Sequence, residues 1–127
     1  MTTEEKDILF KDLCGRLPYG VICDLWMCKN PNEKITEVLK FGGLRMFHED
    51  HINFNIKPYL RPMKSMTADE EKVFLSLSDR LEYDNNTENV VFTTNAVDWL
   101  NEHHFDYRGL IEKGLALEAK GGMYAQT

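Results

Sequence analysis

The sequence predicts a single α+β domain in which a β-rich first half is followed by a helical second half. Strict alternation of apolar and polar residues over Ile52–Ile56 indicates a strand with one buried face. Thr67 and Glu70 have the spacing of a capping box, and the apolar residues that follow them recur at helical intervals. We therefore expect an N-terminal helix, an antiparallel meander of about four strands and three C-terminal helices packed on the sheet. A small open barrel is the alternative form of the meander.

A chain of 127 residues has the length of one domain, so we expect one globular unit over residues 1–127. The first helix and the meander would occupy residues 1–56. A strap bounded by prolines would follow over 57–66, then the helical half over 67–120 and a frayed tail over 121–127.

The composition indicates a cytoplasmic protein. A formal net charge of -6 argues against binding of duplex nucleic acid, which requires a basic face. The three cysteines, Cys14, Cys23 and Cys28, have no zinc-site spacing and fit a reducing compartment. No apolar run reaches the roughly 18 residues of a membrane span, and no secretion-signal pattern opens the chain. We therefore expect no membrane partner.

The first helix should be capped by Thr2 or Thr3 and continue to about Leu17. Pro18 stops this helix because a proline inside a helix removes a backbone hydrogen bond. Asp12 lies off the apolar stripe of the helix, so we expect its side chain to face water.

Four segments of the first half are predicted to be strands. Val21–Trp26 is short and mostly apolar, and Ile35–Leu39 is ambiguous between a strand and a helical turn, with the strand favoured. Leu44–Phe47 alternates and is predicted to be the third strand, and Ile52–Ile56 the fourth. His48–His51 should form a polar loop between the last two.

The second half should begin with a helix at Ala68, and Val90–Thr93 could form either a fifth short strand or an extended lead-in. Thr94 or Asn95 is expected to cap a second helix, and Asp106 a third. The apolar stripe of this last helix would comprise Leu110, Ile111, Gly114, Leu115 and Leu117.

The strap is the first candidate binding surface. Pro58 and Pro62 each fix φ and make the segment stiff and extended. Its basic and aromatic side chains could bind a phosphate, a nucleic-acid strand or an acidic partner surface. In the alternative interpretation, the cations neutralise the acidic residues Asp69–Glu71 and the aromatic ring anchors the strap to the core. The candidate residues are Lys57, Tyr59, Arg61 and Lys64.

Tyr107 and Arg108 form the second candidate surface, because tyrosine and arginine are enriched among the residues that anchor protein interfaces. A structural interpretation accounts for the same residues. Asp106 would cap the last helix, and Tyr107 would pack against Trp99.

The four histidines, His48, His51, His103 and His104, lie in two short clusters that also contain carboxylates. Such side chains could hold a divalent zinc, manganese or iron ion if the two clusters meet in space. Their spacing matches no established motif, and polar turns account for both clusters without a metal. We expect no cofactor unless this alternative holds.

The sequence also resembles a known group of proteins. Leu17–Val21, Lys57–Met63, Ser65–Thr67, Asp98–Asn101 and Asp106–Ala116 carry the resemblance, which spans nearly the whole chain. These segments resemble a family of small proteins of unknown activity encoded in the genomes of gut anaerobes and their phages or prophages. The resemblance implies a phage or mobile-element setting, and it implies no catalytic residue, cofactor or substrate.

The sequence therefore predicts a non-enzymatic module that binds a protein partner, and it leaves open a homo-oligomer. No nucleophile elbow or phosphate-binding loop is present to support an enzyme. A small metal-dependent hydrolase or nuclease that uses the two histidine clusters is the alternative. A third hypothesis is weak binding of single-stranded nucleic acid along the strap, which the acidic net charge disfavours.

Overall fold

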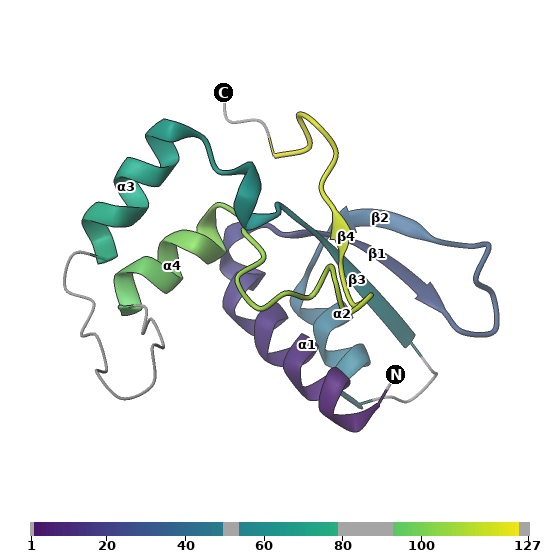
Figure 1. Cartoon of the computed structure of the whole chain (residues 1–127). Helices are drawn as coiled ribbons and strands as arrows, with labels where there is room; N and C mark the ends of the chain where they lie inside the picture. The colour runs from purple at the N-terminus through teal and green to yellow at the C-terminus, as the bar shows by residue number, and fades with distance from the viewer. Residues whose placement is uncertain (1, 50–53, 79–92, 125–127) are drawn as a thin grey trace.

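The computed structural model describes residues 2–49, 54–78 and 93–124 (Figure 1). The strands form one sheet in the order β2-β1-β3-β4; β1 runs antiparallel to β2 and β3, whereas β4 runs parallel to β3. The α+β class is confirmed, but the sheet is mixed rather than an antiparallel meander. The elements are α1 (Thr3–Arg16), the 3-10 turn η1 (Leu17–Tyr19), β1 (Ile22–Met27), β2 (Ile35–Val38), α2 (Phe41–Glu49), β3 (Phe54–Leu60), the 3-10 turn η2 (Met63–Ser65), α3 (Ala68–Ser78), α4 (Thr94–Glu102) and β4 (Leu117–Glu118).

Helix α1 begins as its sequence predicts. The Thr2 hydroxyl accepts a hydrogen bond from the Glu5 N–H at 3.0 Å, and the Glu5 carboxylate accepts one from the Thr2 N–H at 2.9 Å. This reciprocal pair satisfies two N–H groups that have no partner within the helix. The helix gives way to η1, which contains Pro18, and Gly20 then reverses the chain with a φ of +72°.

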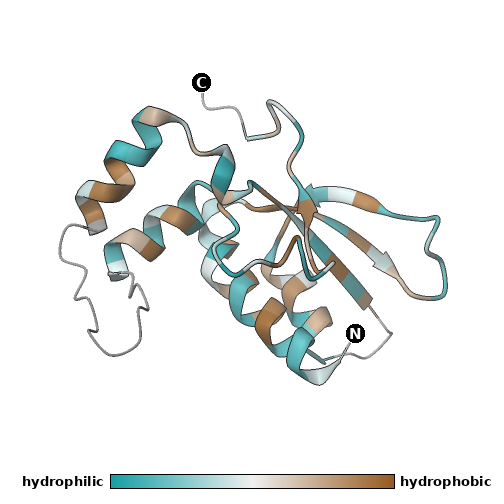
Figure 2. Ribbon diagram, viewed as in Figure 1, coloured by the Kyte–Doolittle hydropathy of each residue, from teal (hydrophilic) through white to brown (hydrophobic). Residues whose placement is uncertain are grey.

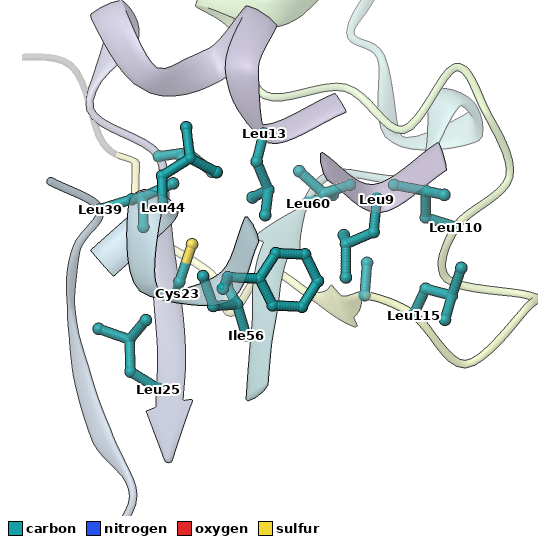
Figure 3. Close-up of a cluster of buried hydrophobic side chains, with 13 residues drawn as sticks. Leu9, Leu13, Cys23, Leu25, Leu39, Leu44, Ile56, Leu60, Leu110 and Leu115 are labelled. Atoms are coloured by element: carbon teal, nitrogen blue, oxygen red, sulfur yellow. The ribbon is translucent and has the colours of Figure 1, made fainter. Parts of the chain in front are cut away.

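Helices α1 and α2 cover one face of the sheet and form the core with it (Figure 1). Leucines of α1 meet alternate residues of β1 and β3, so each strand turns every second side chain inward (Figure 3). Hydrophobic and hydrophilic residues accordingly alternate along the elements in Figure 2. Full burial of such a side chain contributes about 1.5–3 kcal/mol. The central members of the core are Leu9, Leu13, Cys23, Leu25, Leu44, Phe47, Ile56 and Leu60.

The prediction of a strand over Leu44–Phe47 is wrong, because these residues belong to helix α2. Leu44 and Phe47 are both buried and stand three residues apart, whereas Arg45 and Met46 between them are exposed. A four-residue segment with apolar ends fits a helical face as well as an alternating strand, so the pattern alone did not separate the two.

Residues 57–66 do not form a separate strap, because Lys57–Leu60 belong to β3 inside the sheet. Pro58 stands opposite Cys23 of β1. The Leu60 carbonyl accepts from the Ala119 N–H at 2.8 Å, so the backbone nitrogen of Pro58, two residues earlier, faces the same edge of β3. Strand β4 does not reach Pro58 along that edge, because its pairing with β3 starts at Tyr59. Pro58 therefore removes no hydrogen bond between β1 and β3.

The predicted third C-terminal helix is also wrong. Residues 106–116 form successive turns in which Gly109 and Gly114 have φ values of +70° and +74°, and β4 follows. The Asp106 carboxylate does accept hydrogen bonds from the N–H groups of Leu110 and Ile111, at 2.8 and 3.0 Å. A helix does not follow because the chain turns to bury its leucines in the core and to pair with β3.

Among the described residues of the second half, the α-helices are therefore α3 and α4. Thr93 rather than Thr94 or Asn95 caps α4, because its hydroxyl accepts from the Ala96 N–H at 3.1 Å. Helix α4 lies against α1 and α3, and the α3–α4 pair extends away from the sheet (Figure 1). Ile52 and Val90–Phe92 lie outside the described residues. Within the described ranges, no helix is both long and apolar enough to span a membrane.

Candidate functional site

Arg61, a predicted binding residue, joins three parts of the fold. Its guanidinium donates two hydrogen bonds to the Glu70 carboxylate, at 2.7 and 2.6 Å, and lies 4.2 Å from the centre of the Phe105 ring. Its backbone N–H donates to the His104 carbonyl at 2.8 Å. The Arg61 hydrogen bonds are the largest cause that lowers the pKa of Glu70 to about 2. These contacts fasten the end of β3 to the first turn of α3, as the structural interpretation of the strap proposed.

Tyr59 is buried, at 8% exposure, and its hydroxyl donates to the Asp24 carboxylate at 2.9 Å. The Thr36 hydroxyl donates to the other oxygen of the same carboxylate. The three side chains form a polar connection from β2 across β1 to β3, and burial raises the pKa of Tyr59. Lys57 is half-buried opposite Asp24, and Lys64 in η2 is exposed. Lys64 is thus the predicted strap residue that lies most open to solvent.

Tyr107 and Arg108, the second predicted surface, belong to a polar network against α1. Arg108 donates to the Asp12 carboxylate at 3.1 Å, and Arg16 donates to it at 2.7 Å. Asp12 and Arg16 have no exposed side-chain surface, so the expectation that Asp12 faces water is wrong. The Tyr107 hydroxyl donates to the Asn101 side chain at 2.9 Å. The i,i+4 spacing of Asp12 and Arg16 was the sequence signal for this ion pair.

The predicted histidine clusters are dispersed among aromatic contacts. The ring of His48 stacks on Phe10 of α1 with 4.4 Å between centroids, whereas the ring of His103 lies 4.5 Å from that of Trp99. His51 lies outside the described residues. Over residues 2–49, 54–78 and 93–124, no group of three or more histidine, cysteine, aspartate or glutamate side chains is placed to share a metal ion. The metal site remains a prediction that these positions do not support.

A hollow of about 940 Å³ lies between η1, the end of β3, the start of α3, the end of α4 and residues 118–124. The rings of Tyr19, His103, His104 and Tyr124 line it, together with the Arg61–Glu70 pair. Its wall includes both Lys120 and Glu118, so its charges give no preference for one sign.

His104 is the most unusual residue of this wall, with a φ of +63° and 6% exposure. Its Nδ1 has no hydrogen-bond partner among the described residues, and burial is the main cause that lowers its pKa to about 4. The imidazole is therefore neutral at pH 7. Backbone hydrogen bonds hold His104 at this positive φ, because its carbonyl accepts from the Arg61 N–H and its N–H donates to the Asn101 carbonyl. The strain thus has a structural role.

A different surface is exposed at the free edge of the sheet. All four residues of β2 are exposed, and Ile35 and Val38 retain 59% and 46% of their accessible surface. Phe41, at the start of α2, is 68% exposed. We call Ile35, Thr36, Val38 and Phe41 the edge surface. The apolar pattern of residues 35–39 predicts a strand but does not indicate that it is terminal, because the strand order depends on long-range pairing.

Comparisons with known proteins add no assignment for either the hollow or the edge surface. No protein-family model, curated protein or solved structure matches this chain. The functional interpretation therefore depends on the geometry of the described residues.

Proposed function

We propose that this chain is a non-enzymatic protein-interaction module that binds its partner through the edge surface. The observation that carries this proposal is that all four residues of β2, the terminal strand in the sheet order β2-β1-β3-β4, are exposed. A terminal strand presents backbone N–H and C=O groups that can pair with an added strand. A binding partner would also bury the exposed apolar side chains beside these groups, which is favourable.

The edge surface combines these two features within seven residues. Three large apolar side chains, Ile35, Val38 and Phe41, stand on β2 and the adjacent end of α2. A partner segment in extended conformation could therefore gain main-chain hydrogen bonds and apolar contact together.

The contacts of Arg61 and Arg108 favour a role in stability rather than in partner capture. Each guanidinium is bound to a carboxylate of its own chain, Glu70 or Asp12, and neither side chain is more than 26% exposed. Lys57, half-buried on β3, and Lys64, exposed in η2, remain candidate contacts.

Site-specific photo-crosslinking in an extract of the organism that encodes the protein would test the proposal. Val38 and Val73 form a matched pair, because both are valines with 46% exposure and only Val38 lies on the edge surface. We expect a photoreactive residue at position 38 to give a discrete crosslinked protein product, and the same residue at position 73 to give none. Absence of a product at position 38, or equal products at both positions, would contradict the proposal.

A further inference from the structure

We propose that the partner of the edge surface is a second copy of this chain, paired antiparallel through β2 with Thr36 opposite its own symmetry mate. The proposal rests on the proposed function and names its partner. It follows from three observations: which backbone groups of β2 face outward, which side chains share a face, and where the charges lie.

The outward backbone groups are those of Thr36 and Val38. The Leu39 N–H donates to the Val21 carbonyl at 2.8 Å, so the backbone of Leu39 faces β1. Backbone groups alternate along a strand, and Glu37 and Ile35 therefore also face β1. Thr36 and Val38, at the alternate positions, direct their N–H and C=O groups to the free edge.

A second copy can pair with this edge only in certain registers. The symmetric antiparallel arrangement has a two-fold axis perpendicular to the sheet, which keeps each face of the sheet on the same side in both copies. Directly opposite residues have side chains on the same face, so one residue must stand opposite the same residue of the second copy, with the axis midway between them. The candidate centres are Ile35, Thr36, Glu37 and Val38.

Charge and length exclude three of these centres. Centring on Glu37 places Glu37 opposite Glu37 and Lys34 opposite Lys40, and centring on Ile35 places Glu33 opposite Glu37. Like charges that stand directly opposite in a sheet are destabilising. Centring on Val38 places Ile35 opposite Phe41, which belongs to helix α2, so the paired stretch of strand would be short.

Centring on Thr36 opposes no like charges. Thr36 then faces Thr36 of the second copy, Ile35 faces Glu37, and Lys34 faces Val38. The Thr36 and Lys34–Val38 pairs are those whose backbone groups point outward, so they form the hydrogen-bonded rungs between the copies. The Lys34 Nζ lies 4.9 Å from the centre of the Trp26 ring, and the Thr36 hydroxyl donates to the Asp24 carboxylate. Both side chains therefore have defined positions before pairing. One continuous sheet results, and it covers the exposed Val38.

Two substitutions at Val38 test this register, because both remove the same exposed apolar side chain and differ in charge. Val38→Glu places a carboxylate opposite Lys34 of the other copy in two symmetric pairs, and we expect the dimer dissociation constant to fall about fivefold. Val38→Lys places two lysines opposite each other, and we expect the constant to rise by at least as much. Sedimentation velocity over micromolar to millimolar concentrations measures both, and melting temperatures close to that of the unsubstituted protein show that the variants are folded.

Cysteine crosslinking provides an independent measurement of the register. In a Cys14→Ser, Cys28→Ser background, which lacks the exposed native thiols, Thr36→Cys should oxidise to a disulfide-linked dimer, because directly opposed residues lie within disulfide range. Glu37→Cys should form no disulfide-linked dimer under the same oxidant, because Glu37 faces Ile35 of the other copy. A crosslink at position 37 and not at position 36 would overturn the register.

An unsubstituted protein that stays monomeric at all concentrations, or a shift of the same sign for both Val38 variants, would overturn the pairing with a second copy. The proposed function fails separately. If the protein is monomeric and position 38 crosslinks to a different protein, the interaction module stands and the second copy is excluded. If position 38 gives no crosslink of either kind, both proposals are excluded.

Discussion

The Arg108 guanidinium donates to the carboxylate of Asp12 at 3.1 Å, although the two residues lie 96 positions apart in the chain. Asp12 also accepts from Arg16, and neither Asp12 nor Arg16 has exposed side-chain surface. The contact therefore fastens the turn after α4 to the middle of α1. Arg108 therefore stabilises the fold of its own chain, although tyrosine and arginine are also typical of residues that anchor interfaces.

Replacement of Arg108 by alanine should lower the free energy of unfolding by about 1.5–3 kcal/mol, because it removes a charge-assisted hydrogen bond to a buried carboxylate. Urea denaturation measures the change. Arg45→Ala is the control, since Arg45 pairs with Glu49 at the surface with 65% of its side chain exposed, and its loss should cost less than about 0.5 kcal/mol. Equal effects of the two substitutions would show that the buried network contributes little.

The Arg61–Glu70 pair should make stability depend on acidity. The folded-state pKa of Glu70 is about 2, whereas an unperturbed glutamate titrates near about 4.3. The pair therefore stabilises the fold fully above about pH 4.3, and this contribution is lost as the pH falls toward 2. Glu70→Gln should be destabilising at pH 7 and much less so near pH 2. Glu71→Gln, on the exposed side of α3, should show no such pH dependence in chemical denaturation at a series of pH values.

The Tyr124 hydroxyl takes the place of a hydrogen bond between two strands. It accepts from the Ile22 N–H at 2.8 Å and donates to the Tyr59 carbonyl at 2.7 Å, while its ring stacks on His104 at 3.8 Å. Tyr124→Phe removes both hydrogen bonds and should cost about 1–3 kcal/mol. Faster hydrogen exchange of the Ile22 amide would locate the effect. Tyr19→Phe, which changes a more exposed tyrosine, should shift stability by less than about 0.5 kcal/mol.

Two glycines in helices should respond to alanine with opposite signs. A Cβ at Gly15 of α1 would lie 3.0 Å from the Asn101 side-chain nitrogen, and Asn101 is held by its bond to Tyr107. Gly15→Ala should therefore destabilise the protein by about 1–3 kcal/mol through overpacking, despite a better helix propensity. Gly42 of α2 has no atom within 4 Å of the same position, so Gly42→Ala should stabilise the protein by about 0.5–1 kcal/mol. Stabilisation by both alanines in thermal unfolding would exclude close contact between α1 and α4.

The features that the sequence predicted correctly are those decided within a few residues. The Thr67–Glu70 capping box forms as predicted, and Thr2, one of the two residues expected to cap the first helix, caps α1, because each of these hydrogen bonds joins residues three apart. The termination of α1 near Pro18 is also local, since proline lacks the N–H that a helix interior requires. The α+β class follows from the same short-range patterns.

The candidate sites were less accessible to sequence analysis, because their meaning depends on distant partners. Arg61, Tyr59 and Arg108 were all named from their chemistry, but their carboxylate partners lie 9, 35 and 96 residues away. Periodicity does not report such pairings, so it could not separate an exposed binding residue from a buried structural one.

The sequence by itself determined where α1, α3, α4 and the first strands form, since capping, proline geometry and apolar spacing act along a short stretch of chain. Only the tertiary structure decided that Leu44–Phe47 is helical, that residues 106–116 turn, and that β2 is the free edge. These segments have weak local preferences. Burial of Leu44, Leu110 and Leu115 in a core shared with α1, β1 and β3 selects the conformations of the first two segments, and the pairing of β1 with β3 leaves β2 at the edge.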